Sequence, residues 1–485
     1  MAYTEKHTLP ERSEDCQEAV SSDTTPSLNT EETRGDGVLE RYISFVSAIN
    51  FGFVLECSWE ASAVMFQLSL ANGGPASMVY GCFLAGIGTT AVAMSLAEMA
   101  SMDPTVGAQY RWSARFAPRW NKFWGLMQGL AIFNSPDYVP QRWHITLLMW
   151  AITLLPLVGN FWFRKILKLI ESIGAFLHIA FFVASIVTLL AMAQRSSARY
   201  VFQTLTHDVS GWTNPAVAWG IGLLTVTYPL TGDEVVQART RVPRSMILSV
   251  VLNSIMQTTY MVCLLFTIGN VDQVASTPTG LPIIEVYYQA TGSKAATNLF
   301  VAVMGLVIFT SFFNVFASVS RLIWAFSRDK GLPFSNFFGS VNPYLKIPLN
   351  ALLLIGTCVA LLALINIGSS TAFNAFLSLP ALALYISYFL PIFFVFWRRV
   401  TQPKSIAWGP FSLKSMGIPV NLFALCYITF IIAWMPLPTV LPVDGNTMNY
   451  AGPLVGAVIV GALVDWVVSG RKRFQIRTAV PGPRI

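Results

Sequence analysis

INFGFVLECSWEAS, residues 49–62, lies inside a mainly apolar run that extends from about residue 43 to residue 69. A helix needs about 20 apolar residues to cross the hydrocarbon core of a bilayer, so this run is long enough to span it. It nevertheless contains Gly52 and two carboxylates, Glu56 and Glu60. A carboxylate at the centre of a span costs about 2.5 to 3.5 kcal/mol. The pattern therefore indicates a membrane helix that carries a polar site rather than a simple anchor.

Similar apolar runs recur along the chain with short polar gaps between them. Of the 485 residues, 54% are hydrophobic and 11% are charged, whereas an average soluble domain has about 25% charged residues. The sequence therefore predicts an all-α polytopic membrane protein embedded in a lipid bilayer. We expect eleven spans, at residues 43–69, 77–101, 143–163, 167–193, 214–232, 246–270, 298–324, 349–367, 372–397, 417–437 and 450–469.

The two ends of the chain differ from this transmembrane domain, which we place at residues 42–469. Residues 1–41 contain ten Asp or Glu against four Lys or Arg and many Ser and Thr, which predicts a disordered cytosolic tail. Residues 470–485 form a short basic tail, also expected in the cytosol. The net charge of the whole chain is +7, but the basic residues lie in loops rather than along one face, so we expect no nucleic-acid partner.

The basic loops do not agree with a count of eleven spans. Lys and Arg collect in cytoplasmic loops, and every second loop from Arg164 onward is basic. The loop at 102–122 is basic too, yet only the span at 143–163 separates it from Arg164. One crossing cannot join two cytoplasmic loops, and residues 123–135 are too short for a full span. The favoured explanation is a span missing near Gly129 and Leu130; a short re-entrant segment or a misleading charge pattern are the alternatives.

Two spans carry helix-breaking residues beside polar side chains, a combination typical of binding sites at the midplane of transporters. The first span has Gly52, and the fifth has Gly220, Gly222, Pro229 and Gly232. Freed backbone groups and half-helix dipoles at such breaks can hold a polar solute. The expected substrate-binding residues are Gly52, Phe53, Glu56, Ser58, Thr225, Thr227 and Tyr228.

Three intramembrane groups, Glu56, Glu60 and His178, could also carry protons. Glu56 and Glu60 are four residues apart, so on a continuous helix they share one face and could attract a cationic amine or take up a proton. Alternatively, one or both lie near the end of a tilted helix and reach water. His178 could relay protons near neutral pH, although a hydrogen-bonded packing histidine is the competing interpretation. For Glu98, beside a basic loop, we expect an interfacial ion pair rather than a site.

The sequence contains no motif for catalysis, metal binding or a cofactor. It has no metal-ligand spacing, phosphate-cradling Gly loop or nucleophile elbow. Five of the six cysteines, Cys57, Cys82, Cys263, Cys358 and Cys426, lie in apolar runs, which fits neither a disulfide framework nor a metal cluster. We therefore expect neither an enzyme nor a bound cofactor.

Five ordered segments resemble the fungal amino acid/choline branch of the amino acid-polyamine-organocation permeases. They are NGGPASMVYG (72–81), SLAEMASMDPTVGAQYRWSARFAP (95–118), YVPQRWH (138–144), RVPRSM (241–246) and SRLIWAFSRDKGLPFS (320–335). The likeness covers almost all of the chain after the N-terminal tail. It implies twelve spans with cytosolic termini, in which two inverted five-helix repeats precede two C-terminal spans.

The resemblance also implies a function. Such proteins carry amino acids, γ-aminobutyrate, choline or polyamines, often with a proton and usually across the plasma membrane, and bind them between the broken segments that correspond here to 50–58 and 224–232. This chain departs from the pattern where the third span is absent and where Gly232 runs directly into Asp233 and Glu234. We expect a proton-coupled or facilitating transporter of a small nitrogenous solute. An efflux carrier for a secondary product such as an alkaloid, and a nutrient sensor that binds without transport, are the alternatives.

Overall fold

The computed structural model describes residues 45–102, 150, 153–161, 164–230, 241–276, 281–368, 370–445 and 447–474. Every secondary-structure element within these ranges is a helix. Several predictions fall outside them: the tail at 1–41, the loop at 102–122 except Met102, the missing span near Gly129 and Leu130, and the segment after Gly232.

Seven helices in the described part of the chain are long and apolar enough to cross a membrane. They are α4 (Gly74–Met102), α8 (Arg164–Met192), α11 (Arg241–Phe266), α14 (Lys294–Arg328), α17 (Ser370–Thr401), α18 (Gly417–Trp434) and α19 (Ala451–Asp465), which a π-helical turn, η5 (Trp466–Gly470), joins to α20 (Arg471–Arg473). Two shorter apolar helices, α10 (Pro215–Thr227) and α16 (Leu349–Gly368), accompany them. The predicted all-α polytopic fold is confirmed; the count of eleven spans and the repeat arrangement stay predictions.

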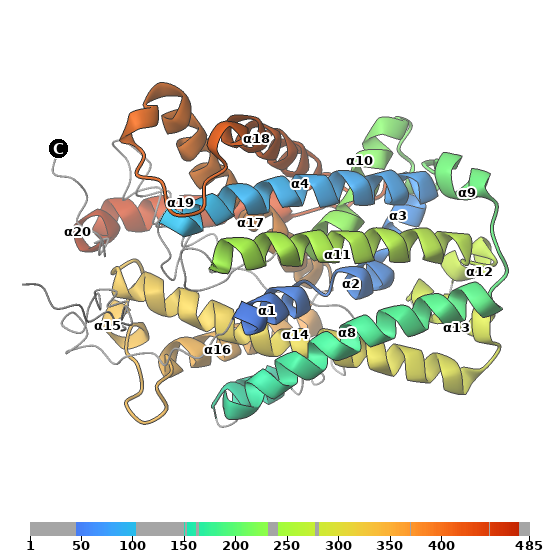
Figure 1. Ribbon diagram of the computed structural model, residues 1–485, viewed down its shortest axis with the longest axis horizontal. Coiled ribbons are helices and arrows are strands. Elements are labelled where there is room, and N and C mark those ends of the chain that lie inside the picture. Colours follow the sequence, from blue (N-terminus) through green and yellow to red (C-terminus); the bar gives the residue numbers. More distant parts are fainter. Residues whose placement is uncertain are drawn as a thin grey trace, which may run out of the picture.

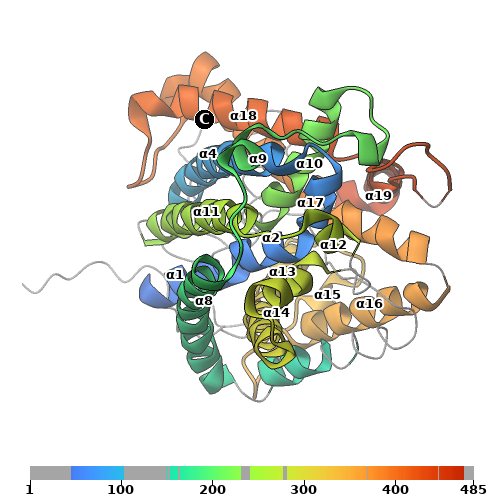
Figure 2. The same ribbon diagram turned by 90° about the vertical axis from the view of Figure 1, so that its right-hand side faces the viewer.

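The first predicted span is divided into three short helices. These are α1 (Phe45–Glu56), α2 (Ser58–Met65) and α3 (Gln67–Ala71). Figure 1 shows α1 and α2 among the long helices, beside α11, α8 and α14. In the end-on view of Figure 2, α2 lies near the middle of the bundle, and α1 packs against α8, α11 and α14. The broken helix is therefore surrounded by continuous ones.

The remaining elements are short helices that lie between the long ones in the sequence. They are α9 (Ala198–Gln203), η1 (Asp208–Ser210), η2 (Tyr228–Leu230), α12 (Val271–Ala275), α13 (Pro282–Thr291), α15 (Ser335–Phe338), η3 (Pro403–Ser405) and η4 (Lys414–Met416). Tyr287 of α13 packs into one end of the bundle, where its hydroxyl lies 2.9 Å from that of Tyr260 and 2.6 Å from Ser185 Oγ. Burial raises the pKa of Tyr287 to about 12, and its hydroxyl therefore keeps its proton near neutral pH.

Helix α8 shows how the sequence pattern positions a helix in this bundle. Its exposed apolar residues recur every three or four positions, as expected for one face of a helix; they are Leu169, Ile173, Phe176, Ile179, Val183 and Val187. A second series with the same spacing is buried and comprises Ala175, His178, Phe181, Ser185 and Leu189. The exposed face suits lipid, and the buried face turns the polar His178 and Ser185 toward α1, α2 and α13.

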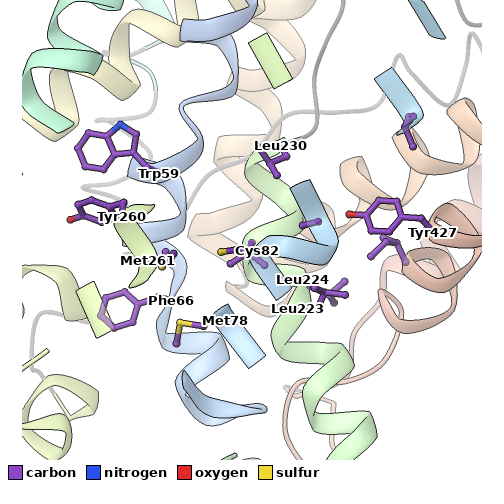
Figure 3. Close-up of a cluster of buried hydrophobic side chains, with 14 of the residues drawn as sticks. Trp59, Phe66, Met78, Cys82, Leu223, Leu224, Leu230, Tyr260, Met261 and Tyr427 are labelled. Atoms are coloured by element: carbon purple, nitrogen blue, oxygen red, sulfur yellow. The ribbon is translucent and has the colours of Figure 1, made fainter. Parts of the chain in front are cut away.

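The main buried cluster joins the broken helix to its neighbours. Figure 3 shows Trp59 beside Tyr260, with Phe66 and Met78 below them, and Tyr427 on the opposite side of α10. The Trp59 and Tyr260 ring centroids lie 4.6 Å apart. Fully buried aromatic rings of this size contribute strongly to packing, which fixes α2 against α11.

Close packing of α10 depends on two glycines that the sequence pattern indicated as helix breakers. A Cβ on Gly222 would lie 2.1 Å from the backbone oxygen of Asn72, and one on Gly220 would lie 1.8 Å from Trp434 Nε1. Both distances are far below van der Waals contact. Within α10, which is helical through Thr227, these glycines therefore permit close approach of neighbouring segments.

We expect Gly222→Ala to destabilise the protein by about 1 to 3 kcal/mol, because the added methyl collides with rigid backbone. Gly305→Ala on α14 is the matched control, since a Cβ at that position would meet nothing within 4 Å. The measurement is the temperature at which half of the detergent-solubilised protein still elutes as a single species in size exclusion. Equal midpoints for the two variants would contradict the role of Gly222 in packing.

Candidate functional site

The first span breaks at Cys57, between α1 and α2. Cys57 has φ 40° and ψ 45°, in the left-handed region that residues other than glycine rarely adopt. Such a conformation costs about 1 to 3 kcal/mol and persists only where the surroundings hold it. The side chain of Cys57 is 5% exposed, so the break lies in the interior of the protein.

Side chains satisfy the carbonyl groups that the break leaves without helical partners. The last four carbonyls of a helix lack intrahelical donors. Asn253 Nδ2 donates to Phe53 O at 3.3 Å, and Ser311 Oγ donates to Leu55 O at 3.0 Å. The thiol of Cys57 itself donates to Val54 O at 3.1 Å. Helices α11 and α14 therefore supply two of the donors that allow α1 to end inside the bundle.

Asn253 also contacts the start of α2. The hydroxyl of Ser58, the first residue of α2, donates to Asn253 Oδ1 at 2.7 Å and lies 3.2 Å from its backbone oxygen. One amide thus bonds to both sides of Cys57, through its oxygen to α2 and through its nitrogen to α1. In this structure the Ser58 hydroxyl proton is directed at Asn253, and its predicted role in substrate binding stays a prediction.

Glu60 and His178 meet in the interior. Glu60 Oε1 lies 2.6 Å from His178 Nδ1, and both side chains are fully buried. The second carboxylate oxygen of Glu60 and Nε2 of His178 have no hydrogen-bond partner within the described ranges. The ring of Phe53 stands edge-on to the imidazole, with centroids 4.6 Å apart. The structure thus brings His178 of α8 into contact with residues on both sides of the break.

Glu56 is the last residue of α1 and is 4% exposed. The four-residue spacing predicted that Glu56 and Glu60 share one face of a continuous helix. That premise is wrong, because Cys57 ends the helical repeat between them and the two carboxylates belong to different helices. Both remain buried beside the break, so the alternative of a water-exposed helix end does not describe either residue.

Aromatic rings line the α2 side of the break. Trp59 lies 4.6 Å from Tyr260, 5.3 Å from Phe181 and 6.1 Å from the His178 imidazole, measured between ring centroids. Gly52 and Phe53 of α1 are buried as well. Aromatic faces attract organic cations, most strongly where water is excluded. Carboxylates next to such rings form a setting suited to an amine.

The second broken span, α10, ends beside the first. Its last helical residue is Thr227, the turn η2 follows, and η2 contacts α2. Gln257 Nε2 donates to Val226 O at 2.6 Å. Thr227 Oγ1 donates to Leu223 O at 3.0 Å and lies 3.5 Å from the hydroxyl of Tyr427.

Two buried polar atoms at α10 and α11 lack hydrogen-bond partners among the described residues. They are Thr225 Oγ1 and Gln257 Oε1. The side chain of Tyr228 and residues 231–240 lie outside the described set. The predicted binding roles of Thr225, Thr227 and Tyr228 therefore stay predictions.

Glu98 forms a separate ion pair away from the break. Its Oε1 lies 2.6 Å from Arg399 Nη2 and accepts from the backbone N–H of Leu413 at 2.9 Å. Arg399 also stacks over Trp408, with its guanidinium carbon 4.3 Å from the ring centroid. This agrees with the interpretation of Glu98 as a structural ion pair that ties the loop after α17 to α4.

Three residues of the site were not identified from the sequence: Asn253, Gln257 and Ser311. All three are uncharged polar side chains in predicted spans that carry several other Ser, Thr or Asn residues. The available signal was the four-residue spacing of the two amides, which places both on one face of α11. That spacing alone does not reveal that the amides bond to two different broken helices.

Comparisons with known proteins match the sequence of this chain to one family. The profile of a family described as "Amino acid permease" matches residues 123–461. A choline transporter of Saccharomyces cerevisiae is 28% identical over 479 residues, covering 91% of this chain and 84% of that protein. Amino-acid permease 2 of Neurospora crassa is 26% identical over 500 residues, with 94% and 90% covered. An amino-acid permease of Oryza sativa subsp. japonica is 28% identical over 490 residues, with 90% and 92% covered.

The buried pair of Glu60 and His178 generates a stability prediction. Removing one partner of a buried hydrogen-bonded pair leaves the other polar group unsatisfied and costs about 1 to 3 kcal/mol. We expect Glu60→Ala and His178→Ala each to lower thermal stability, and the double variant to lie close to either single one. The measurement is again the size-exclusion midpoint in detergent.

Additive losses in this double-mutant cycle would show that the two side chains do not act as a pair. Glu285→Ala is the control for loss of a carboxylate elsewhere, because Glu285 Oε1 accepts a hydrogen bond from Gln289 on its own helix, α13.

Proposed function

This chain belongs to the amino acid permease family, and we propose that it is a secondary transporter of an amino acid or a related small nitrogenous solute, such as choline, γ-aminobutyrate or a polyamine. The observation that supports this best is the break at Cys57, where a buried helix ends between two carboxylates in the middle of a membrane-spanning bundle. A carboxylate in such a place is costly and usually faces a solute pathway.

The proposed substrate site lies between the α1–α2 break and the end of α10. A cationic amine would be held by Glu56 and by the aromatic rings around Trp59 and Phe53. The carboxylate of an amino acid would meet the backbone N–H groups at the start of α2, where the helix dipole is positive and no side chain caps the helix. Thr225 Oγ1 and Gln257 Oε1 are buried groups that could complete the hydrogen bonds to the solute.

We further propose that transport is coupled to a proton carried by Glu60 and His178. The two groups share one short contact, and each retains an atom without a partner among the described residues. Protonation would alter the bond that joins α2 to α8. A charge change at this contact would therefore bias the position of the broken helix relative to its continuous neighbour.

Alternating access would arise from movement of α1, α2 and α10 against the continuous helices. A short helix beside a break can pivot without disrupting the hydrogen bonds of a long one. We propose the plasma membrane as the location. Import is the favoured direction, whereas an efflux carrier would use the same site with the opposite driving force and a sensor would bind without transport.

Uptake by cells that express the protein tests the proposal. Radiolabelled choline, γ-aminobutyrate, polyamines and amino acids are offered separately, and we expect at least one to accumulate above the level of empty cells. Glu56→Gln should reduce that uptake about tenfold or more, because the replaced group binds the cation. Glu285→Gln on α13 is the matched control and should transport normally.

Binding of the solute to purified protein without accumulation in cells would support a sensor and reject transport. Loss of preloaded solute from expressing cells, without uptake, would instead support efflux.

Proton coupling has its own test in proteoliposomes. An acidic exterior should increase solute uptake by the wild-type protein, because proton entry then drives it. Glu60→Gln and His178→Gln should bind solute but lose this response to the gradient. A response of the same size in both variants would reject the proton role of the pair.

A further inference from the structure

Asn253 and Gln257 lie one helical turn apart on α11, about 6 Å along the axis at 1.5 Å per residue. α11 runs without interruption from Arg241 to Phe266 beside both broken spans. Figures 1 and 2 show α11 between α4 and the α1–α2 pair. The two amides are almost completely buried, with exposed fractions of 0% for Asn253 and 1% for Gln257.

We propose that Asn253 and Gln257 are positioning residues that together fix the two broken helices relative to each other. Asn253 bonds to both sides of Cys57, through Phe53 O and the Ser58 hydroxyl. Gln257 bonds to Val226 O at the end of α10. Because one continuous helix carries both amides, release of either broken helix from α11 removes part of the support that fixes the other. This inference rests on the proposed function only where it concerns substrate.

The chemistry of the amide explains why these residue types occur here. Asn253 must donate to a carbonyl and accept from a hydroxyl at the same time, and a carboxamide has one group for each task. A carboxylate can only accept. Gln257, four residues later, has the extra methylene that carries its amide to Val226 O, a contact between helices rather than within one.

Two hydroxyl residues next to these amides on α11 bond within their own helix. Ser254 Oγ donates to Val250 O at 2.7 Å, and Thr258 Oγ1 donates to Ser254 O at 2.7 Å. Both hydroxyls therefore bond back to their own helix, as Ser and Thr commonly do within apolar helices. Asn253 and Gln257, which precede them in the sequence, bond to other helices instead. Thr258 thus offers a control next to Gln257 in sequence.

Reactivity of Cys57 reports directly on the break. In a background with Cys16, Cys82, Cys263, Cys358 and Cys426 replaced by Ala, a membrane-permeant maleimide is added to protein in lipid nanodiscs, and labelling of Cys57 is followed by mass. Asn253→Ala should increase the labelling rate about tenfold, because it removes hydrogen bonds on both sides of the break. Gln257→Ala should also increase it severalfold, although Gln257 bonds to α10 rather than to the residues around Cys57.

Thr258→Val is the matched control and should label at the background rate. Asn253→Asp provides a second variant that keeps an acceptor for Ser58 but loses the donor to Phe53 O; it should label faster than the background. If Asn253→Ala does not fold, Asn253→Asp and Ser58→Ala carry the same test.

An unchanged rate in Gln257→Ala would overturn the proposal, because the two amides would then act separately. An unchanged rate in the Asn253 variants would overturn it as well. Transport is measured in parallel: we expect the KM of the transported solute to rise about tenfold in Asn253→Asp, which has no proposed contact with the solute, and not in Thr258→Val.

Faster labelling without uptake of any offered solute, even by the wild-type protein, would support the positioning role and reject the proposed function. Normal uptake with unchanged labelling would support the proposed function and reject the positioning role.

Discussion

A helix that ends inside a bilayer leaves carbonyl oxygens that no water can reach, and each costs several kcal/mol unless protein supplies a donor. In this chain the end of α1 meets that constraint through Asn253 of α11, Ser311 of α14 and the thiol of Cys57. The left-handed turn at Cys57 persists because these donors hold it. Glu56, Glu60 and Trp59 lie buried on either side of this break, and the turn η2 at the end of α10 contacts α2.

The Glu60–His178 contact is not a simple source of stability. Burying two such groups costs desolvation energy that their attraction only partly offsets, so an apolar pair of the same volume could be as stable. Their presence next to a broken helix, with an unbonded atom on each among the described residues, fits a group that changes state. Glu98 differs in its setting: its Oε1 contacts both Arg399 and the backbone N–H of Leu413, and it lies on the continuous helix α4, although its Oε2 also lacks a partner among the described residues.

Seven long apolar helices of the described residues could be predicted from the sequence, because length and hydropathy decide which helices cross a bilayer; the count of eleven stays a prediction. Glycines beside polar residues marked the first and fifth spans as unusual, but Gly52 lies within α1 and Gly220 and Gly222 lie within α10, so these glycines are not where the helices end. The resemblance placed the first break within residues 50–58, but the sequence did not assign it to Cys57, because Cys57 has no intrinsic preference for positive φ and adopts it among contacts with α11 and α14. The same break invalidated the expectation that Glu56 and Glu60 share a face.

Contacts between residues far apart in the chain could not be predicted from the sequence either. Glu60 and His178 were each recognised as unusual for a membrane helix, but nothing local indicates that they meet across 118 positions. Asn253 and Gln257 were overlooked because their partners are mainly backbone oxygens, which every residue has.

A cryo-EM map of the protein in lipid nanodiscs with saturating solute tests the central claim most directly. We predict solute density between Cys57 and Thr225 with α1 ending at Glu56; a continuous helix through Cys57, or density elsewhere, would contradict it.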